Sequence, residues 1–272
     1  MLENEKKWLP QMEPRWYRNI QLLLFSILYS VKEDPAKAPE LFEFYIDALG
    51  RELEGFYSYY AFQSDVGVNA ERWLAIPGLQ QAASQQKSIS LERYNVATIP
   101  WNISRIMEAQ KNIQERGYDP DTYQGVCRCI AYPELNFAIV SKRHHHTAAA
   151  RAQRSPFVAE VSCFNLCSRF QELRVSGSLR WCDCSGNENT ELIPDPRFAL
   201  MYELARQKHL LLTLGKDRYM SSESGYSSFV CYAKNVTPRY TEIGLSPWQS
   251  FLFRLAKVKV LENGRIVIPQ SI

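Results

Sequence analysis

The stretch ELRVSGSLRW, residues 172–181, has the most regular pattern in the chain. Apolar or small residues alternate with charged or polar residues along its whole length. The first set is Leu173, Val175, Gly177, Leu179 and Trp181, and the second is Glu172, Arg174, Ser176, Ser178 and Arg180. A period of two predicts a β-strand with one buried face, because successive side chains point to opposite sides of a sheet. We therefore expect this stretch to be a central strand.

Segments on both sides of this stretch also have the composition of strands. They are LERYNVATI (91–99), GVCRCIAY (125–132), LNFAIVS (135–141), FVAEVSCFN (157–165), SSFVCYAKNV (227–236) and FLFRLAKVKVLENGRIVIP (251–269). Each is rich in β-branched, aromatic or other apolar residues and is bounded by turn-forming residues. The Asn263-Gly264 pair in the last segment predicts a tight hairpin turn.

Helices are predicted before and between these strands. Apolar residues recur at helical spacing in 13–33, 39–60, 102–121 and 195–209, with Gly117 as a stop and Asp195 as an N-cap. The run QQAASQQKS (80–88) indicates a linker or an exposed helix end. The order of elements predicts an α+β fold: an antiparallel split β-barrel over 91–272 with flanking helices, preceded by an N-terminal helical extension over 1–90.

The composition excludes several classes of protein. The chain has 272 residues, 46% of them hydrophobic and 22% charged, which is typical of a globular protein. Its net charge of only +3 argues against a nucleic-acid partner. The N-terminus lacks the apolar region of a signal peptide, and the longest apolar run (20–31) is too short to span a membrane. We therefore expect no membrane association, and a location in the cytoplasm or an organelle interior.

The basic stretch SKRHHHTAAARAQRSP, residues 141–156, is the clearest candidate site. It predicts a turn from a strand into an Ala-rich helix, where backbone N–H groups and cationic side chains would favour an anion. An exposed polar loop is the alternative. Consecutive histidines on a regular element cannot all reach one metal ion, and the seven cysteines have no zinc-site spacing. No metal is therefore expected, although cysteines on neighbouring strands could converge on one.

The order of GVCRCIAY, LNFAIV, SKRHHHTAAARAQRSP, FVAEVSCFN and SRFQELRVSG resembles the FMN-binding split-barrel superfamily of pyridoxamine 5'-phosphate oxidase. The resemblance covers residues 91–272. It implies an FMN cofactor at the interface of a homodimer, and a seven-residue cofactor site. This site would consist of Arg128, Ser141, Lys142, Arg143, Thr147, Glu172 and Arg174.

Each of these residues takes its role from the resemblance. Ser141, Lys142 and Arg143 would hold the FMN phosphate, and Arg128 would reach the phosphate or the ribityl chain. Arg128 could equally pair with a carboxylate such as Glu160 or Glu172, because a cation in an apolar strand needs a partner.

Two positions depart from the family pattern. Thr147 or Ala148 stands where a lysine is usual, and Glu172 stands where a glutamine faces the flavin. A carboxylate beside a reduced flavin is electrostatically unfavourable.

The resemblance therefore implies an FMN-dependent oxidoreductase whose small-molecule substrate and catalytic residues are not indicated. A cofactor-free split barrel that acts as a scaffold or regulatory binding protein is the alternative. A third possibility is a haem protein with one of His144 to His146 as axial ligand. For a phosphate ligand, Lys142→Ala and Arg143→Ala are each expected to weaken binding.

Overall fold

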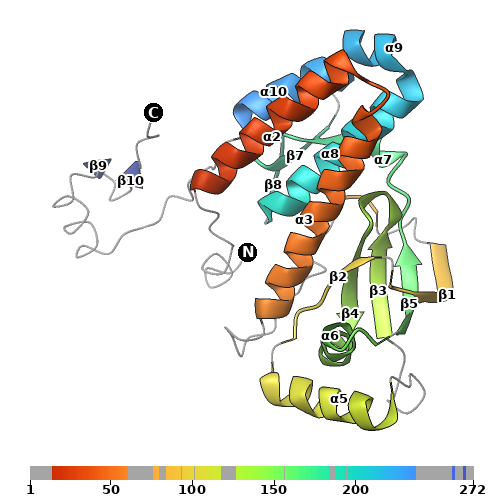
Figure 1. The fold of residues 1–272 in the computed structure, drawn as a ribbon. Helices are drawn as coiled ribbons and strands as arrows, with labels where there is room; N and C mark the ends of the chain where they lie inside the picture. Colours follow the sequence, from red (N-terminus) through yellow and green to blue (C-terminus); the bar gives the residue numbers. More distant parts are fainter. Residues whose placement is uncertain are drawn as a thin grey trace. The chain divides into compact units, whose positions relative to one another are not determined.

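A computed structural model gives the fold of the chain (Figure 1). It describes residues 14–60, 76–79, 84–92, 94–100, 102–117, 127–155, 157–183, 188–193, 195–236, 259–260 and 266–267. The chain divides into two compact units, Met1–Val236 and Thr237–Ile272, which are described separately.

The first unit contains an open, mixed sheet of five strands. These are β1 (Ser84–Ser90), β2 (Asn95–Ala97), β3 (Cys127–Tyr132), β4 (Phe137–Lys142) and β5 (Val158–Cys163), in the spatial order β1-β5-β3-β4-β2. The pairs β1–β5 and β3–β4 are antiparallel, whereas β3–β5 and β2–β4 are parallel. Parallel and antiparallel neighbours therefore alternate across the sheet.

This sheet corrects the predicted antiparallel split barrel, which is wrong. The sequence prediction joined consecutive strands as antiparallel neighbours, but helix α6 (His144–Ala152) lies between β4 and β5. The connection through α6 takes the chain past β3, so that β5 pairs with the edge of β3 that β4 leaves free and runs parallel to β3. The order β1-β5-β3-β4-β2 has β1 and β2 as its two edge strands, so the sheet is open.

The stretch 172–181 is also not a single central strand. Its residues form the end of helix α7 (Arg169–Glu172), strand β6 (Leu173–Val175), a turn, and the start of strand β7 (Arg180–Asp183). With β8 (Glu188–Leu192) they make a separate antiparallel sheet of three strands.

The Ser-Gly-Ser segment at the centre of this stretch makes the turn. Ser176 N–H donates to the Arg180 carbonyl at 2.9 Å, and Leu179, at φ 57°, donates to the Ser176 carbonyl at 2.9 Å. The alternation continues on both sides of the turn, so period two alone did not show that the chain reverses.

Helices make up most of the remaining described structure. They are α2 (Pro14–Glu33), α3 (Ala38–Tyr60), α5 (Ile103–Arg116), η1 (Pro133–Leu135), α8 (Pro196–Leu214), α9 (Lys216–Ser221), η2 (Glu223–Ser227) and α10 (Ser228–Asn235). Two predicted ends are confirmed: Gly117 N–H closes α5 on the Ile113 carbonyl, and the Asp195 carboxylate accepts from Arg197 N–H to cap α8. Within the described residues, no helix combines the length and apolarity that a membrane crossing needs.

Two segments have a different structure from the one predicted. SSFVCYAKNV forms α10 rather than a strand, because its buried residues Phe229, Tyr232, Ala233 and Val236 recur at helical spacing. QQAASQQKS, predicted as a linker, contributes to β1, which pairs with β5 along the sheet edge.

The five-stranded sheet has a buried core on each face. On one face Phe137 and Ile139 join the large core that α3 and α8 cover. On the other face small side chains such as Cys127, Ala138 and Ala149 form a second core with α5 and α6 (Figure 1). Small residues let α6 lie close to the sheet, and this places the polar end of α6 beside α5.

The second unit is described only at two short strands. Strands β9 (Lys259–Val260) and β10 (Ile266–Val267) pair in antiparallel register, with Ile266 opposite Val260. This pairing agrees with the predicted hairpin, while the Asn263-Gly264 turn itself lies outside the described residues.

Candidate functional site

The basic stretch forms the predicted turn from a strand into a helix. Strand β4 ends at Lys142, Arg143 is the N-cap with left-handed backbone angles (φ 76°, ψ 36°), and α6 begins at His144. The first helical hydrogen bond runs from Thr147 N–H to the Arg143 carbonyl at 3.0 Å. Next to this turn the pairing of β3 with β4 shifts register, so that Ser141 is an extra residue in β4.

Two of the three histidines are fixed by backbone hydrogen bonds. Ile99 N–H donates to Nδ1 of His144 at 3.2 Å, and Asn102 N–H donates to Nε2 of His145 at 3.2 Å. An imidazole nitrogen that accepts a hydrogen bond cannot carry a proton. The neutral rings therefore carry their protons on Nε2 of His144 and Nδ1 of His145.

The surroundings keep all three histidines uncharged at neutral pH. Burial lowers the pKa of His144 to about 4, helped by the neighbouring His145. Burial and the Arg105 charge lower the pKa of His145. The pKa of His146 is lowered by burial and by Arg143, and Glu108 opposes this shift. Hence the fixed positive charge here comes from arginine.

These histidines line a cavity between α5 and α6. Its volume is about 440 Å3 and its wall consists of Arg105, Glu108, Ala109, Asn112, Arg143, His144, His145 and His146. On α5 the spacing of Arg105, Glu108 and Asn112 puts the three side chains on one helix face. The size is within the usual range for small-molecule sites.

The charged groups of the wall have no ionic partner among the described residues. Neither guanidinium, Arg105 or Arg143, forms an ion pair or side-chain hydrogen bond there, and the same holds for the Glu108 carboxylate. By contrast, Arg128 pairs with Glu160, and Arg151 forms two hydrogen bonds to Glu54. The cavity therefore presents two cations and one anion that are available to a ligand.

Of the seven predicted cofactor residues, Arg143 is the one that lines this cavity within the described structure. Arg128 is exposed on β3, and its Nε lies 3.1 Å from Glu160 Oε2, so a structural carboxylate is its partner. Ser141 donates to the Arg128 carbonyl at 3.2 Å. Lys142 is exposed at the end of β4, opposite Arg128.

The remaining three predicted residues do not form one site. Thr147 is buried in the first turn of α6, where its hydroxyl donates to the Arg143 carbonyl at 3.0 Å. Glu172 is exposed and pairs with Arg169 at the end of α7. Arg174 lies on β6, in the three-stranded sheet, opposite Cys182.

The α5 residues of the cavity were not predicted from the sequence. Arg105, Glu108 and Asn112 look like the solvent side of an amphipathic helix, because Ala109 and Ile113 form its buried face. Their spacing at i, i+3 and i+7 is a weak signal of a shared face. Only the packing of α5 on α6 shows that this face meets the histidines.

Two cysteines lie beneath the turn. Cys127 Sγ is 3.2 Å from the Thr147 hydroxyl and 3.8 Å from Cys129 Sγ, and both cysteines are buried. The hydrogen bond within this pair lowers the pKa of the Cys127 thiol and raises that of Cys129. No three His, Cys, Asp or Glu side chains gather as a metal site in the part of the chain that the structure describes.

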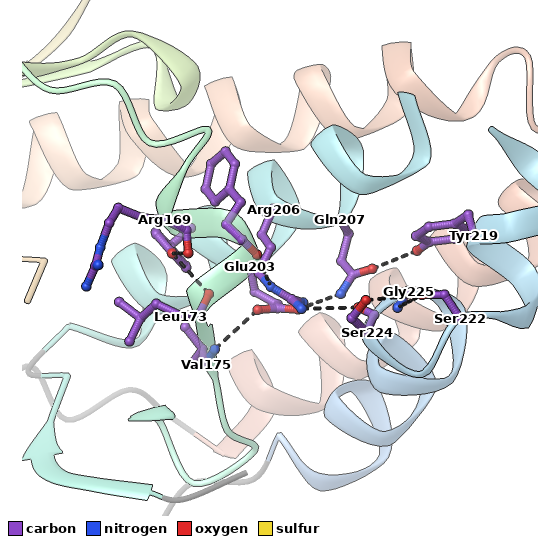
Figure 2. A network of polar contacts seen from close by, with 12 residues as sticks. Arg169, Leu173, Val175, Glu203, Arg206, Gln207, Tyr219, Ser222, Ser224 and Gly225 are labelled. Carbon is purple, nitrogen blue, oxygen red and sulfur yellow. Dashed lines mark hydrogen bonds and ion pairs between the residues drawn. The ribbon is translucent and has the colours of Figure 1, made fainter. Parts of the chain in front are cut away.

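A second polar cluster lies in the large core around α8 (Figure 2). Glu203 Oε1 accepts hydrogen bonds from Arg206 at 2.9 Å and Gln207 at 2.7 Å, and Glu203 Oε2 accepts from Val175 N–H at 3.3 Å. Tyr219 donates to Gln207 at 2.8 Å.

The other Arg206 nitrogens complete this cluster. Arg206 donates to the carbonyls of Phe170 at 3.0 Å and Ser224 at 3.1 Å. Because these buried groups satisfy one another, the cluster links α8 to β6 and η2 as a structural network.

Comparison with known proteins identifies a family. The chain matches no curated protein and no solved structure. A family model, described as a family of unknown function (DUF6710), matches residues 3–211. This match includes α5, α6 and the whole cavity wall. Together with the open sheet it corrects the resemblance to the split-barrel superfamily. The chain belongs to the DUF6710 family, whose function is unknown.

Proposed function

We propose that the protein binds a small phosphorylated molecule in the cavity between α5 and α6. The observation that carries the proposal is the pair of guanidinium groups, Arg105 and Arg143, that line one cavity without an ionic partner among the described residues. Arginine is well suited to phosphate because its planar fork donates two parallel hydrogen bonds.

Two further features of the wall support an anionic ligand. The first N–H groups of α6 start at this wall and have no acceptor inside the helix. The histidine rings are neutral near pH 7, so the positive charge of the wall comes from the two arginines and does not vary in this range. The wall therefore attracts an anion at Arg105 and Arg143, and Glu108 is its one carboxylate.

FMN stays a candidate ligand because it carries a phosphate monoester. The flavin oxidoreductase was suggested by the split-barrel resemblance, which is wrong. The homodimer and haem hypotheses rested on the same resemblance and lose its support as well. Binding of a phosphorylated small molecule by a protein without redox activity fits the cavity better, and agrees with the binding-protein alternative.

Calorimetric titration of the full chain with inorganic phosphate, and separately with FMN, tests the proposal. Arg143→Asn removes the guanidinium and keeps a residue that tolerates left-handed angles. Loss of a charge-assisted hydrogen bond should weaken binding by about 10- to 150-fold, since it is worth roughly 1.5–3 kcal/mol.

Lys142→Asn is the matched control, because it removes the same charge one residue away on an exposed side chain. Because water and salt screen an exposed charge, this variant should change the affinity for phosphate less than about twofold. Equal losses in the two variants would point to general charge attraction, and no binding of either ligand by the wild type would contradict the proposal.

A further inference from the structure

The acidic member of the cavity wall, Glu108, carries an inference about the class of ligand. A cavity built for phosphate alone would contain only donors and positive charges, because a carboxylate repels a phosphate at short range. Glu108 nevertheless lies on the cavity face of α5, one helical turn from Arg105.

No ion pair joins Glu108 to either arginine of the wall. Arg105 and Glu108 have the i, i+3 spacing at which ion pairs form, as Arg169 and Glu172 do elsewhere in the chain. Within the described residues the Glu108 carboxylate has no hydrogen-bond donor. It is therefore available to accept hydrogen bonds from a ligand.

The size of the cavity also indicates a ligand larger than a phosphate group. A volume of about 440 Å3 corresponds to roughly fifteen water molecules, which is far more than one phosphate group fills. The ligand therefore has a second part that extends along the wall of α5 toward Glu108 and Asn112.

The charges of the wall suggest what this second part carries. Two guanidinium groups and one carboxylate leave a single net positive charge, with the histidines neutral. A phosphate monoester has a charge of about −1.5 to −2 at pH 7. An ester that also bears an ammonium group has a net charge near −1, which matches the wall.

We infer that the ligand is a phosphate monoester bearing a cationic amine, with the phosphate at Arg105 and Arg143 and the ammonium group at Glu108. This inference rests on the proposed function and makes it more specific.

Two esters of equal shape test it by calorimetry: O-phosphoethanolamine, and n-propyl phosphate, in which a methyl group replaces the ammonium group. Wild type should bind the amine ester at least about tenfold more tightly, because a hydrogen bond to a charged group is worth about 1.5–3 kcal/mol. Glu108→Gln should weaken the amine ester and strengthen n-propyl phosphate, so that the preference disappears.

Glu115→Gln is the control, because Glu115 lies on the same helix but outside the cavity wall and faces Lys111 at 3.9 Å. It should leave both affinities unchanged. If both esters bind, Arg143→Asn weakens both and Glu108→Gln leaves their ratio unchanged, then the phosphate site stands and the amine inference is wrong. If neither ester binds the wild type, the proposed function itself fails.

Discussion

At the scale of single residues, the cavity wall couples folding to pH through His144. Its pKa is about 4 in the folded protein and about 6.5 ordinarily. Between these values the unfolded chain binds a proton that the folded chain does not. The contribution of His144 to stability is therefore complete above pH 6.5 and is lost as the pH falls toward 4.

His144→Asn should reduce this pH dependence. The asparagine Oδ1 occupies the place of Nδ1 and can accept from Ile99 N–H, but it does not titrate. Between pH 7 and pH 5 the free energy of unfolding of the wild type should fall by about 2 kcal/mol more than that of the variant. Urea unfolding of the wild type and the variant at both pH values measures this difference. Equal falls would show that His144 is not held in a neutral state.

Some residues of the candidate site could be predicted from the sequence, and others could not. The position of Arg143 at a strand-to-helix turn was predictable, because the end of an apolar strand and the start of an Ala-rich helix are local signals. Arg105 and Glu108 were not, because their role depends on how α5 packs on α6. The partner of Arg128 could be narrowed to a phosphate or a carboxylate, and the structure selects Glu160.

At the scale of elements, the turn between β6 and β7 depends on Gly177. A Cβ atom on Gly177 would lie 2.5 Å from both the Cβ atom and the carbonyl oxygen of Asn235, at the end of α10. Gly177→Ala should therefore destabilise the protein by about 1–3 kcal/mol, because backbone atoms must shift to make room.

Gly55→Ala is the matched comparison in helix α3. Gly55 is exposed and a Cβ atom there meets no atom within 4 Å. Because alanine favours a helix interior, this change should stabilise the protein by about 0.5–1 kcal/mol. Thermal unfolding of the wild type and both variants measures these two changes in stability. A neutral Gly177→Ala would mean that the turn does not pack on α10 as described.

Elements were predictable where their signals are local. Helix α8 was found from its Asp195 cap, and α5 from its Gly117 stop, because each signal acts within one turn of the helix. The pairing of β9 with β10 was predictable from a local hairpin signal, but the neighbours of β5 were not, because the connection through α6 decides which edge β5 joins. Likewise, the alternation in residues 172–181 continues across the turn between β6 and β7, so it cannot reveal that the chain reverses there.

At the scale of the whole molecule, the hydrophobic core of the described structure lies entirely within Met1–Val236. Helix α3 is central to it, since Phe42, Ile46, Leu53 and Tyr57 are buried against α8 and the sheet. The helices at the N-terminus therefore form part of the main core.

A chain that ends at Val236 should fold cooperatively. Its melting temperature should lie within about 4 °C of that of the full chain, which corresponds to roughly 1 kcal/mol for a domain of this size. Differential scanning calorimetry compares the two chains. Aggregation of the shorter chain, or a much larger fall in its melting temperature, would show that the second unit is required for folding.

The central claim is that the three-histidine wall of the cavity meets a phosphorylated ligand. It can be tested directly because the chain has four histidines, three of which line the cavity, while His209 lies on α8 against Phe170. In protein labelled with 15N at histidine, NMR follows all four imidazole rings during titration with O-phosphoethanolamine. We predict saturable shifts of the His144, His145 and His146 signals, while His209 stays unchanged. Cavity signals that do not move, or that drift together with His209 without saturation, would contradict the account.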